Sequence, residues 1–114
     1  GGEGTDRHSI ALASDQQALC DAVIGVGKPT VVVMVNGGII AIDTLTKSAP
    51  AILEAFMPGV HGAQAIAETV FGDNVPGGKL PVTVYTSSYV KEVDFLSMDM
   101  SAAPGRSYRY YTGV

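Results

Sequence analysis

The carboxylates are the side chains of this sequence that could catalyse hydrolysis. Glu3 and Asp6 stand three residues apart near the start, and Glu92 and Asp94 stand two apart further on. Two carboxyl groups that face each other across a sugar catalyse glycoside hydrolysis, at about 5–5.5 Å for retention or about 6.5–9.5 Å for inversion. Spacing along the chain does not establish such a pair, so composition alone favours a solvated surface position for each acid.

The other reactive side chains lack the partners that catalysis or metal binding requires. His8 and His61 form neither an H-x-x-x-H nor an H-E-x-x-H pattern, and for His61 a loop or capping role is favoured. Cys20 is the single cysteine, which excludes an internal disulfide and a cysteine-based zinc site. We interpret Cys20 as a small buried or half-buried hydrophobe. The sequence therefore predicts no metal site and no cofactor.

Two helices and one helical turn are predicted from apolar periodicity and capping patterns. Residues 14–26 predict a helix, because Ser14 and Gln17 have capping-box spacing and apolar residues follow at helical intervals. A second helix is predicted over 62–71 from its apolar stripe. Between them, Asp43 is the predicted cap of a single helical turn.

Continuous apolar runs predict the strands. The runs Thr30–Val35 and Ala51–Phe56 have the two-sided apolar character of buried parallel strands. Leu80–Tyr85 predicts a third strand, at an edge because Pro81 lies near its start. The fold class is therefore α/β, with a mainly parallel sheet flanked by helices. Two helices barely cover three strands, so we expect further strands from outside this chain and association through an uncovered apolar face.

A glycine-rich turn follows the first predicted strand. In α/β sheets such turns form ligand loops, and Asn36-Gly37-Gly38 occupies that position. No G-x-G-x-x-G or Walker pattern accompanies it, which argues against a nucleotide-binding domain. A tight turn alone explains these glycines.

Length and charge exclude several classes of protein. The 114 residues suffice for one domain, and 7 Lys+Arg against 11 Asp+Glu give a net charge of −4, which argues against nucleic-acid binding. The apolar runs are far shorter than the ~20 residues of a membrane span, and no signal peptide is visible.

Only the tail after Pro104 is basic. Its tyrosines with Arg106 and Arg109 predict a segment that docks by ring burial and arginine–carboxylate pairing.

Six short motifs occur along the chain in a fixed order: Glu3–Arg7 (E-G-T-D-R), Lys28–Val33 (K-P-T-V-V-V), Asn36–Gly38 (N-G-G), Ala51–Asp73 (beginning A-I-L-E-A), Pro76–Thr83 (P-G-G-K-L-P-V-T) and Pro104–Tyr111 (P-G-R-S-Y-R-Y-Y). Together they resemble the C-terminal domain of glycoside hydrolase family 3, over nearly the whole chain. Tyr89–Val93 with Met98–Met100 is similar to the Y-V-x-x-V-x-M-x-x-M stretch of its β-xylosidase branch. This resemblance favours β-xylosides as substrates and leaves β-glucosides and α-L-arabinofuranosides open.

The resemblance implies a fold, a mechanism and site residues. The fold would be part of an (α/β)6 sandwich, which faces an N-terminal (β/α)8 barrel that supplies the nucleophilic aspartate. Glu3 matches the acid/base glutamate of a retaining, exo-acting β-glycosidase. Asp6 and Arg7 match the pair that holds its loop by an ion pair or backbone hydrogen bonds. Branch members often carry a second acid two residues earlier, where this chain has Gly1, so an acid upstream of Gly1 is the alternative acid/base.

We therefore expect residues 1–114 to form part of one domain, with an α/β core over about 1–85 and an extended tail over 86–114. Without the barrel and its nucleophile, these residues alone would not turn over a glycoside. The resemblance implies a glycoside or oligosaccharide substrate and a secreted or periplasmic location. The alternative function is a non-catalytic carbohydrate-binding or docking module.

Overall fold

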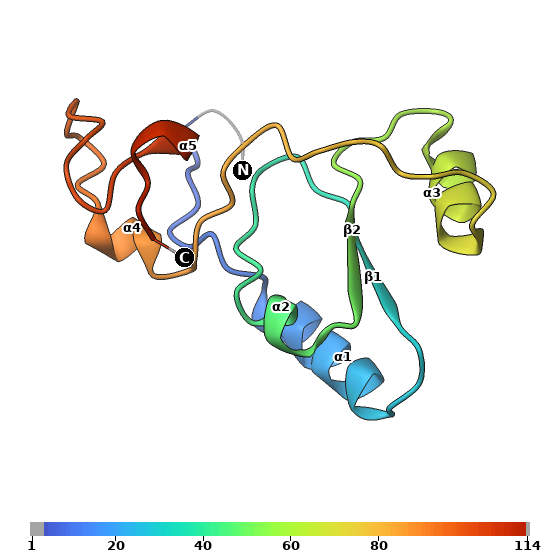
Figure 1. Ribbon diagram of the computed structural model, residues 1–114. Coiled ribbons are helices and arrows are strands. Elements are labelled where there is room, and N and C mark those ends of the chain that lie inside the picture. The colour runs from blue at the N-terminus through green and yellow to red at the C-terminus, as the bar shows by residue number, and fades with distance from the viewer. Residues whose placement is uncertain (1–3, 114) are drawn as a thin grey trace.

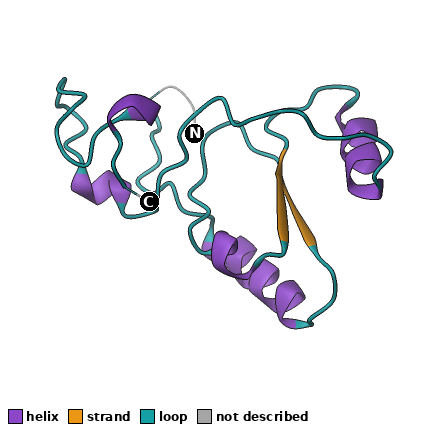
Figure 2. Cartoon of the chain, viewed as in Figure 1, coloured by secondary structure: helices purple, strands orange, loops and turns teal. Residues whose placement is uncertain are grey.

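The structure is a computed structural model that describes residues 4–113 (Figure 1). Short elements are joined by long loops, as the colouring of Figure 2 makes plain. No helix within residues 4–113 is long and apolar enough to cross a membrane. In chain order, the elements are α1 (Ser14–Gly25), β1 (Val31–Met34), α2 (Leu45–Ser48), β2 (Ala51–Glu54), α3 (Gly62–Phe71), α4 (Tyr89–Glu92) and α5 (Ser107–Tyr110).

The two strands form a parallel sheet, as the two-sided apolar runs predicted. Val31 pairs with Ala51 and the register continues to Met34 opposite Glu54. The α2 turn lies in the connection between the strands, and α1 lies beside α2 (Figure 1). A parallel sheet with helices is the α/β architecture predicted above.

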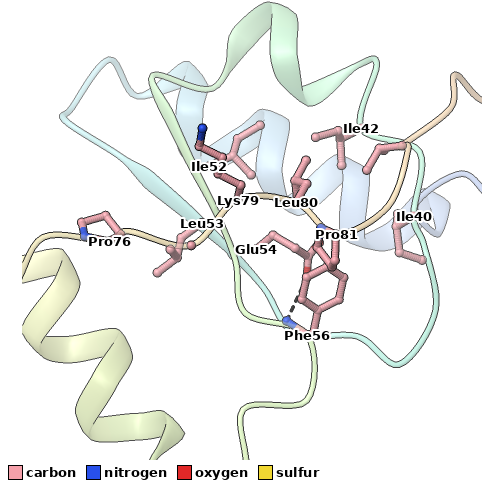
Figure 3. A pocket seen from close by; sticks show the side chains of 12 residues that line it. Ile40, Ile42, Ile52, Leu53, Glu54, Phe56, Pro76, Lys79, Leu80 and Pro81 are labelled. Carbon is pink, nitrogen blue, oxygen red and sulfur yellow. Dashed lines mark hydrogen bonds between the residues drawn. The ribbon is translucent and has the colours of Figure 1, made fainter. Parts of the chain in front are cut away.

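The predicted third strand does not form. Leu80–Tyr85 runs as a loop, and β1 and β2 are the only paired strands within residues 4–113. Pro81 carries no N–H, so this segment lacks one of the donors that a sheet ladder requires. Its side chains pack toward β2 instead, where Leu80 and Pro81 line a cavity together with Ile52 (Figure 3).

The predicted capping box at the start of α1 is wrong. The N-cap residue is Ala13, and no side chain caps this end. Gln17 is engaged elsewhere: its Nε2 donates to Asp21 at 2.8 Å, and its Oε1 accepts from the Thr44 hydroxyl at 2.7 Å. A tertiary contact between α1 and the start of α2 has therefore taken the side chain that a local cap would use.

The end of the helix over 62–71 is as predicted, with Gly72 in the left-handed conformation.

Asp43 is not a helix cap either. The N-cap of α2 is Thr44, without a side-chain cap. The Asp43 carboxylate instead accepts the backbone N–H and the hydroxyl of Ser87, both at 3.0 Å. Partial burial raises the pKa of Asp43, but the Ser87 hydrogen bonds and the nearby Lys47 outweigh it and lower the pKa overall. One carboxylate thereby ties the α2 region to the segment that leads into α4.

Replacing Asp43 with asparagine is expected to lower the free energy of unfolding by about 1–2 kcal/mol at pH 7, because hydrogen bonds to a charged group are lost. A lowered folded-state pKa stabilises the fold above the unfolded pKa of about 3.9, and this contribution is lost as pH falls through the folded value. The difference between parent and variant should therefore vanish at acid pH. Urea unfolding at several pH values measures this difference in unfolding free energy. The control is Asp73→Asn, because Asp73 is exposed. A pH-independent difference would contradict this account.

The hydrophobic core of the described residues is small. Only Met34, Ala41 and Leu45 are buried apolar side chains within residues 4–113. The radius of gyration is 16.0 Å, against about 13 Å for a compact domain of this length. Leu19 on α1 is 65% exposed, and Val26, which follows the helix, is 68% exposed. Exposed apolar side chains therefore occur on α1, and Val31, Val33 and Val35 in and after β1 are exposed as well, as expected for a sheet with few covering helices.

Candidate functional site

The predicted acid/base residue, Glu3, lies outside the described residues. The described part of its loop begins at Gly4, whose φ is +74°. Residues with a side chain seldom adopt this left-handed conformation, so glycine allows the chain to bend here. The bend comes one residue after Glu3 in the sequence.

Arg7 connects this loop to the turn that follows β1. Its Nη2 donates to the carbonyl oxygen of Ile39 at 2.9 Å. Further along, the N–H of Ala41 donates to the Ile10 carbonyl at 2.7 Å, and Ala11 pairs with Ala41 as a parallel bridge. The loop that carries Asp6 and Arg7 thus runs beside residues 38–42.

A second group of polar contacts holds the carboxyl ends of β1 and β2. The Nδ2 of Asn36 donates to both carboxylate oxygens of Glu54, at 3.2 Å each. The N–H of Phe56 donates to Glu54 at 2.9 Å, and the N–H of Asn36 donates to the Phe56 carbonyl at 3.2 Å. The other amide atom of Asn36, Oδ1, is buried without a hydrogen-bond partner among the described residues. The turn after β1 therefore starts from a position fixed by both strands.

Sequence reasoning missed Glu54. The signal was one acid at the end of an otherwise apolar strand, where a parallel sheet directs its loops. Glu54 also lines a largely apolar cavity of about 660 Å³ between β2 and the loop 76–84, where the dashed line in Figure 3 marks its bond to Phe56. Its carboxylate is engaged by Asn36 and Phe56, which gives it a structural task in holding the turn.

A smaller cavity lies against the loop of the predicted site. Its volume is about 460 Å³, and Asp6, Arg7 and His8 line it together with apolar side chains that include Val90 and Phe95. It brings the N-terminal loop beside α4 and the residues that follow it. No cluster of three or more metal-ligating side chains occurs within residues 4–113.

The other candidate residues are dispersed. His61 is the N-cap residue of α3 and its side chain makes no capping bond. Glu92 is exposed at the end of α4, while Asp94 accepts the N–H of Leu96. Cys20 is half-buried on α1. Asp6, Arg7 and His8 therefore line one cavity, to which neither His61 nor Cys20 contributes.

Three tyrosines form a cluster that docks the C-terminal segment. The rings of Tyr85 and Tyr89 stack at 3.8 Å, and Tyr111 meets Tyr85 edge-on at 4.9 Å. Burial raises the pKa of Tyr89, whose hydroxyl donates to the carbonyl of Gly105 at 2.9 Å. Docking by ring burial was expected for Tyr108, Tyr110 and Tyr111, and of these only Tyr111 joins the cluster, because Tyr108 is 91% exposed and Tyr110 41%. The expected arginine–carboxylate pairing is wrong for Arg106, whose guanidinium donates to the backbone carbonyl of Asp94 at 2.7 Å.

Comparison with known proteins gives one consistent result. The family model of the Glycosyl hydrolase family 3 C-terminal domain matches residues 1–113. The chain is 38% identical over 119 residues to beta-xylosidase/alpha-L-arabinofuranosidase 1 of Medicago sativa subsp. varia, covering 97% of this chain and 15% of the relative. It is 39% identical over 114 residues to a probable exo-1,4-beta-xylosidase of Aspergillus fumigatus, covering 96% and 15%. The chain thus spans about 15% of the length of these relatives.

A solved structure is similar over the same extent. A GH3 exo-beta-xylosidase in complex with a xylobiose aziridine activity-based probe superposes with a TM-score of 0.90 at 28% identity. The match covers 99% of this chain and 16% of that one. The arrangement of elements described above is therefore shared with that protein.

Proposed function

The chain belongs to the glycosyl hydrolase family 3 C-terminal domain family, and from this premise we propose that it is the acid/base-bearing part of a retaining, exo-acting β-glycosidase. The observation that carries the proposal is the extent of the match. The family model covers residues 1–113, and the relatives named as β-xylosidases cover 96–97% of the chain. A full-length protein of this family is a glycoside hydrolase.

The names of the relatives favour β-xylosides as the substrate. Two independent kinds of relative, one plant and one fungal, are named as β-xylosidases, and the plant protein is also named as an α-L-arabinofuranosidase. The solved structure holds a xylobiose-derived probe. We therefore place terminal β-linked xylose first, with α-L-arabinofuranosides and β-glucosides as the alternatives, and propose secretion or a periplasmic location for the whole protein.

In this proposal Glu3 acts twice. As an acid it protonates the oxygen of the leaving group while a carboxylate from the barrel domain attacks the anomeric carbon. As a base it then takes a proton from the water that hydrolyses the glycosyl-enzyme. The bend at Gly4 and the contact of Arg7 with Ile39 support this role. An acid on a loop needs a fixed backbone to reach first the oxygen of the leaving group and then the attacking water.

The test compares the full-length polypeptide that contains these residues with the 114-residue chain on p-nitrophenyl β-xyloside and xylobiose. The full-length protein is expected to release xylose, and the 114-residue chain to release none, because the reaction needs two carboxylates. A full-length protein inactive on xylosides, glucosides and arabinofuranosides would contradict the proposal. Binding of xylobiose to it without turnover would then favour a non-catalytic module.

A further inference from the structure

We propose that two adjoining cavities beside α4 form one binding site for aryl β-glycosides. The sugar would lie in the cavity of about 460 Å³ that Asp6, Arg7 and His8 line. The aromatic aglycone would lie in a second cavity, of about 470 Å³, that Tyr85 and Tyr89 line. This inference deepens the proposed function and rests on it, because it takes a glycoside as the ligand.

The two cavities adjoin because Val90 and Phe95 line both of them. Val90 belongs to α4, and Phe95 follows that helix. The side chain of Phe95 is 89% exposed, so it borders the cavities without belonging to the hydrophobic core. The N-terminal segment, drawn in blue in Figure 1, runs near α4, so residues from both ends of the chain share this site. A ligand that occupied both cavities would cross the Phe95 ring.

The first cavity offers hydrogen-bonding groups of both kinds. The carboxylate of Asp6 accepts hydrogen bonds, the guanidinium of Arg7 carries five N–H donors, and a neutral histidine such as His8 both donates and accepts. One of the Arg7 donors is engaged by the Ile39 carbonyl at 2.9 Å. Each hydroxyl of a sugar also donates and accepts. The polar lining of this cavity therefore matches a sugar ring.

The second cavity is mainly apolar and aromatic. The stacked rings of Tyr85 and Tyr89 form part of its wall, together with Val93 and Met100. A methionine thioether makes favourable contacts with aromatic rings. Sites for small molecules are usually clefts of about 300–1,000 Å³ with largely apolar linings and a few polar groups. Both the size and the lining of this cavity therefore suit an aromatic ring.

The polar residues of the second cavity already have partners. The guanidinium of Arg106 donates to the Asp94 carbonyl at 2.7 Å, and the N–H of Ser107 donates to the Tyr85 hydroxyl at 2.6 Å. A second sugar in this cavity would bring hydroxyl groups against mostly apolar walls, and polar groups removed from water without a partner are costly. The contrast between the two cavities thus favours an aryl glycoside over a longer saccharide.

The experiment measures the binding of two thioglycosides to the full-length polypeptide by isothermal titration calorimetry. The ligands are methyl 1-thio-β-xyloside and 2-naphthyl 1-thio-β-xyloside, whose glycosidic sulfur resists hydrolysis. The naphthyl compound is expected to bind about tenfold more tightly than the methyl compound. Its rings leave water for the apolar cavity, and only part of this gain appears as affinity.

Substitutions at the two ends of the site should have different effects. Phe95→Ala and Met100→Ala are expected to bring the two affinities within about twofold of each other, without weakening the methyl compound. His8→Ala should weaken both compounds by the same factor, because it changes only the sugar end. The matched controls are Leu96→Ala and Met98→Ala, since these side chains are 84% and 91% exposed on the same loop and line neither cavity.

Equal affinities of the two compounds for the unchanged protein would overturn the proposal, as would a tenfold ratio that survives both Phe95→Ala and Met100→Ala. A lower urea midpoint for Phe95→Ala with an unchanged ratio would also overturn it, and would show that another part of the polypeptide covers these cavities. Turnover of xylobiose by the same preparation separates the two proposals. Turnover with equal affinities removes only the aryl site, whereas the absence of both turnover and binding removes the aryl site and the proposed function together.

Discussion

Replacing Glu3 with glutamine in the full-length polypeptide is expected to lower kcat/KM for xylobiose by about 10²–10⁴-fold, the usual contribution of general acid catalysis. Glutamine has nearly the same shape but cannot release or take up the proton, so substrate contacts that depend on shape remain. Steady-state kinetics measures the loss. The limb of the pH–rate profile that reports ionisation of the acid should also disappear, because the variant has no group to titrate there.

Azide provides the control for the second half of the mechanism. With Glu3→Ala and an aryl xyloside that has a good leaving group, azide should restore turnover, because an anionic nucleophile attacks the glycosyl-enzyme without a general base. Glu92→Gln, a glutamate change at an exposed position of α4, should leave the kinetics unchanged. Unaltered hydrolysis by Glu3→Gln, with no effect of azide on Glu3→Ala, would reassign the acid/base to a carboxylate upstream of Gly1.

Replacing Gly105 with alanine is expected to cost about 3 kcal/mol or more of unfolding free energy. Gly105 has a φ of +90°, and a Cβ there would overlap the backbone carbonyl of Tyr110. The backbone conformation and the overlap each contribute, and a backbone atom cannot rotate away as a side chain can. The carbonyl of Gly105 also accepts the hydroxyl of Tyr89 at 2.9 Å, so displacement would disturb the tyrosine cluster.

Limited proteolysis and urea unfolding of the full-length polypeptide measure this effect. Cleavage within residues 104–113 is expected to accelerate in Gly105→Ala, because these residues would detach from Tyr85 and Tyr89. The matched control is Gly77→Ala, where a Cβ meets nothing within 4 Å and the φ is not left-handed. Equal cleavage rates and equal urea midpoints for the two variants would show that the turn at Gly105 can relax.

The sequence predicted the elements that depend on local pattern. The strands around Val31 and Ala51 and the helix that ends at Gly72 follow from continuous apolar runs and from the glycine C-cap. The third strand failed because strand formation needs a hydrogen-bonded neighbour, which periodicity does not report. The residues from Leu80 onward find contacts on the side chains of β2 instead of pairing with its backbone.

Polar side chains were harder to place than apolar ones. Asp43 and Gln17 have the residue types of helix caps, but each is engaged by a partner distant in sequence. Glu54 stood out only as the one acid at the end of an apolar strand, and its partner could not be predicted because that depends on which residues end the neighbouring strand. The candidate site was predictable only through the resemblance of Glu3–Arg7 to a family motif, whereas the contact of Arg7 with Ile39 required the fold.

The bond between Asp43 and Ser87 has a consequence for the order of folding. Its partners are 44 residues apart, whereas β1 and β2 pair residues 20 apart, such as Val31 and Ala51. Closing the longer loop costs more chain entropy, so the strand pair should form first and this bond late. Interactions that form after the transition state act on the rate of unfolding. Asp43 should therefore govern how long the segment toward α4 stays attached, with little influence on how fast the sheet assembles.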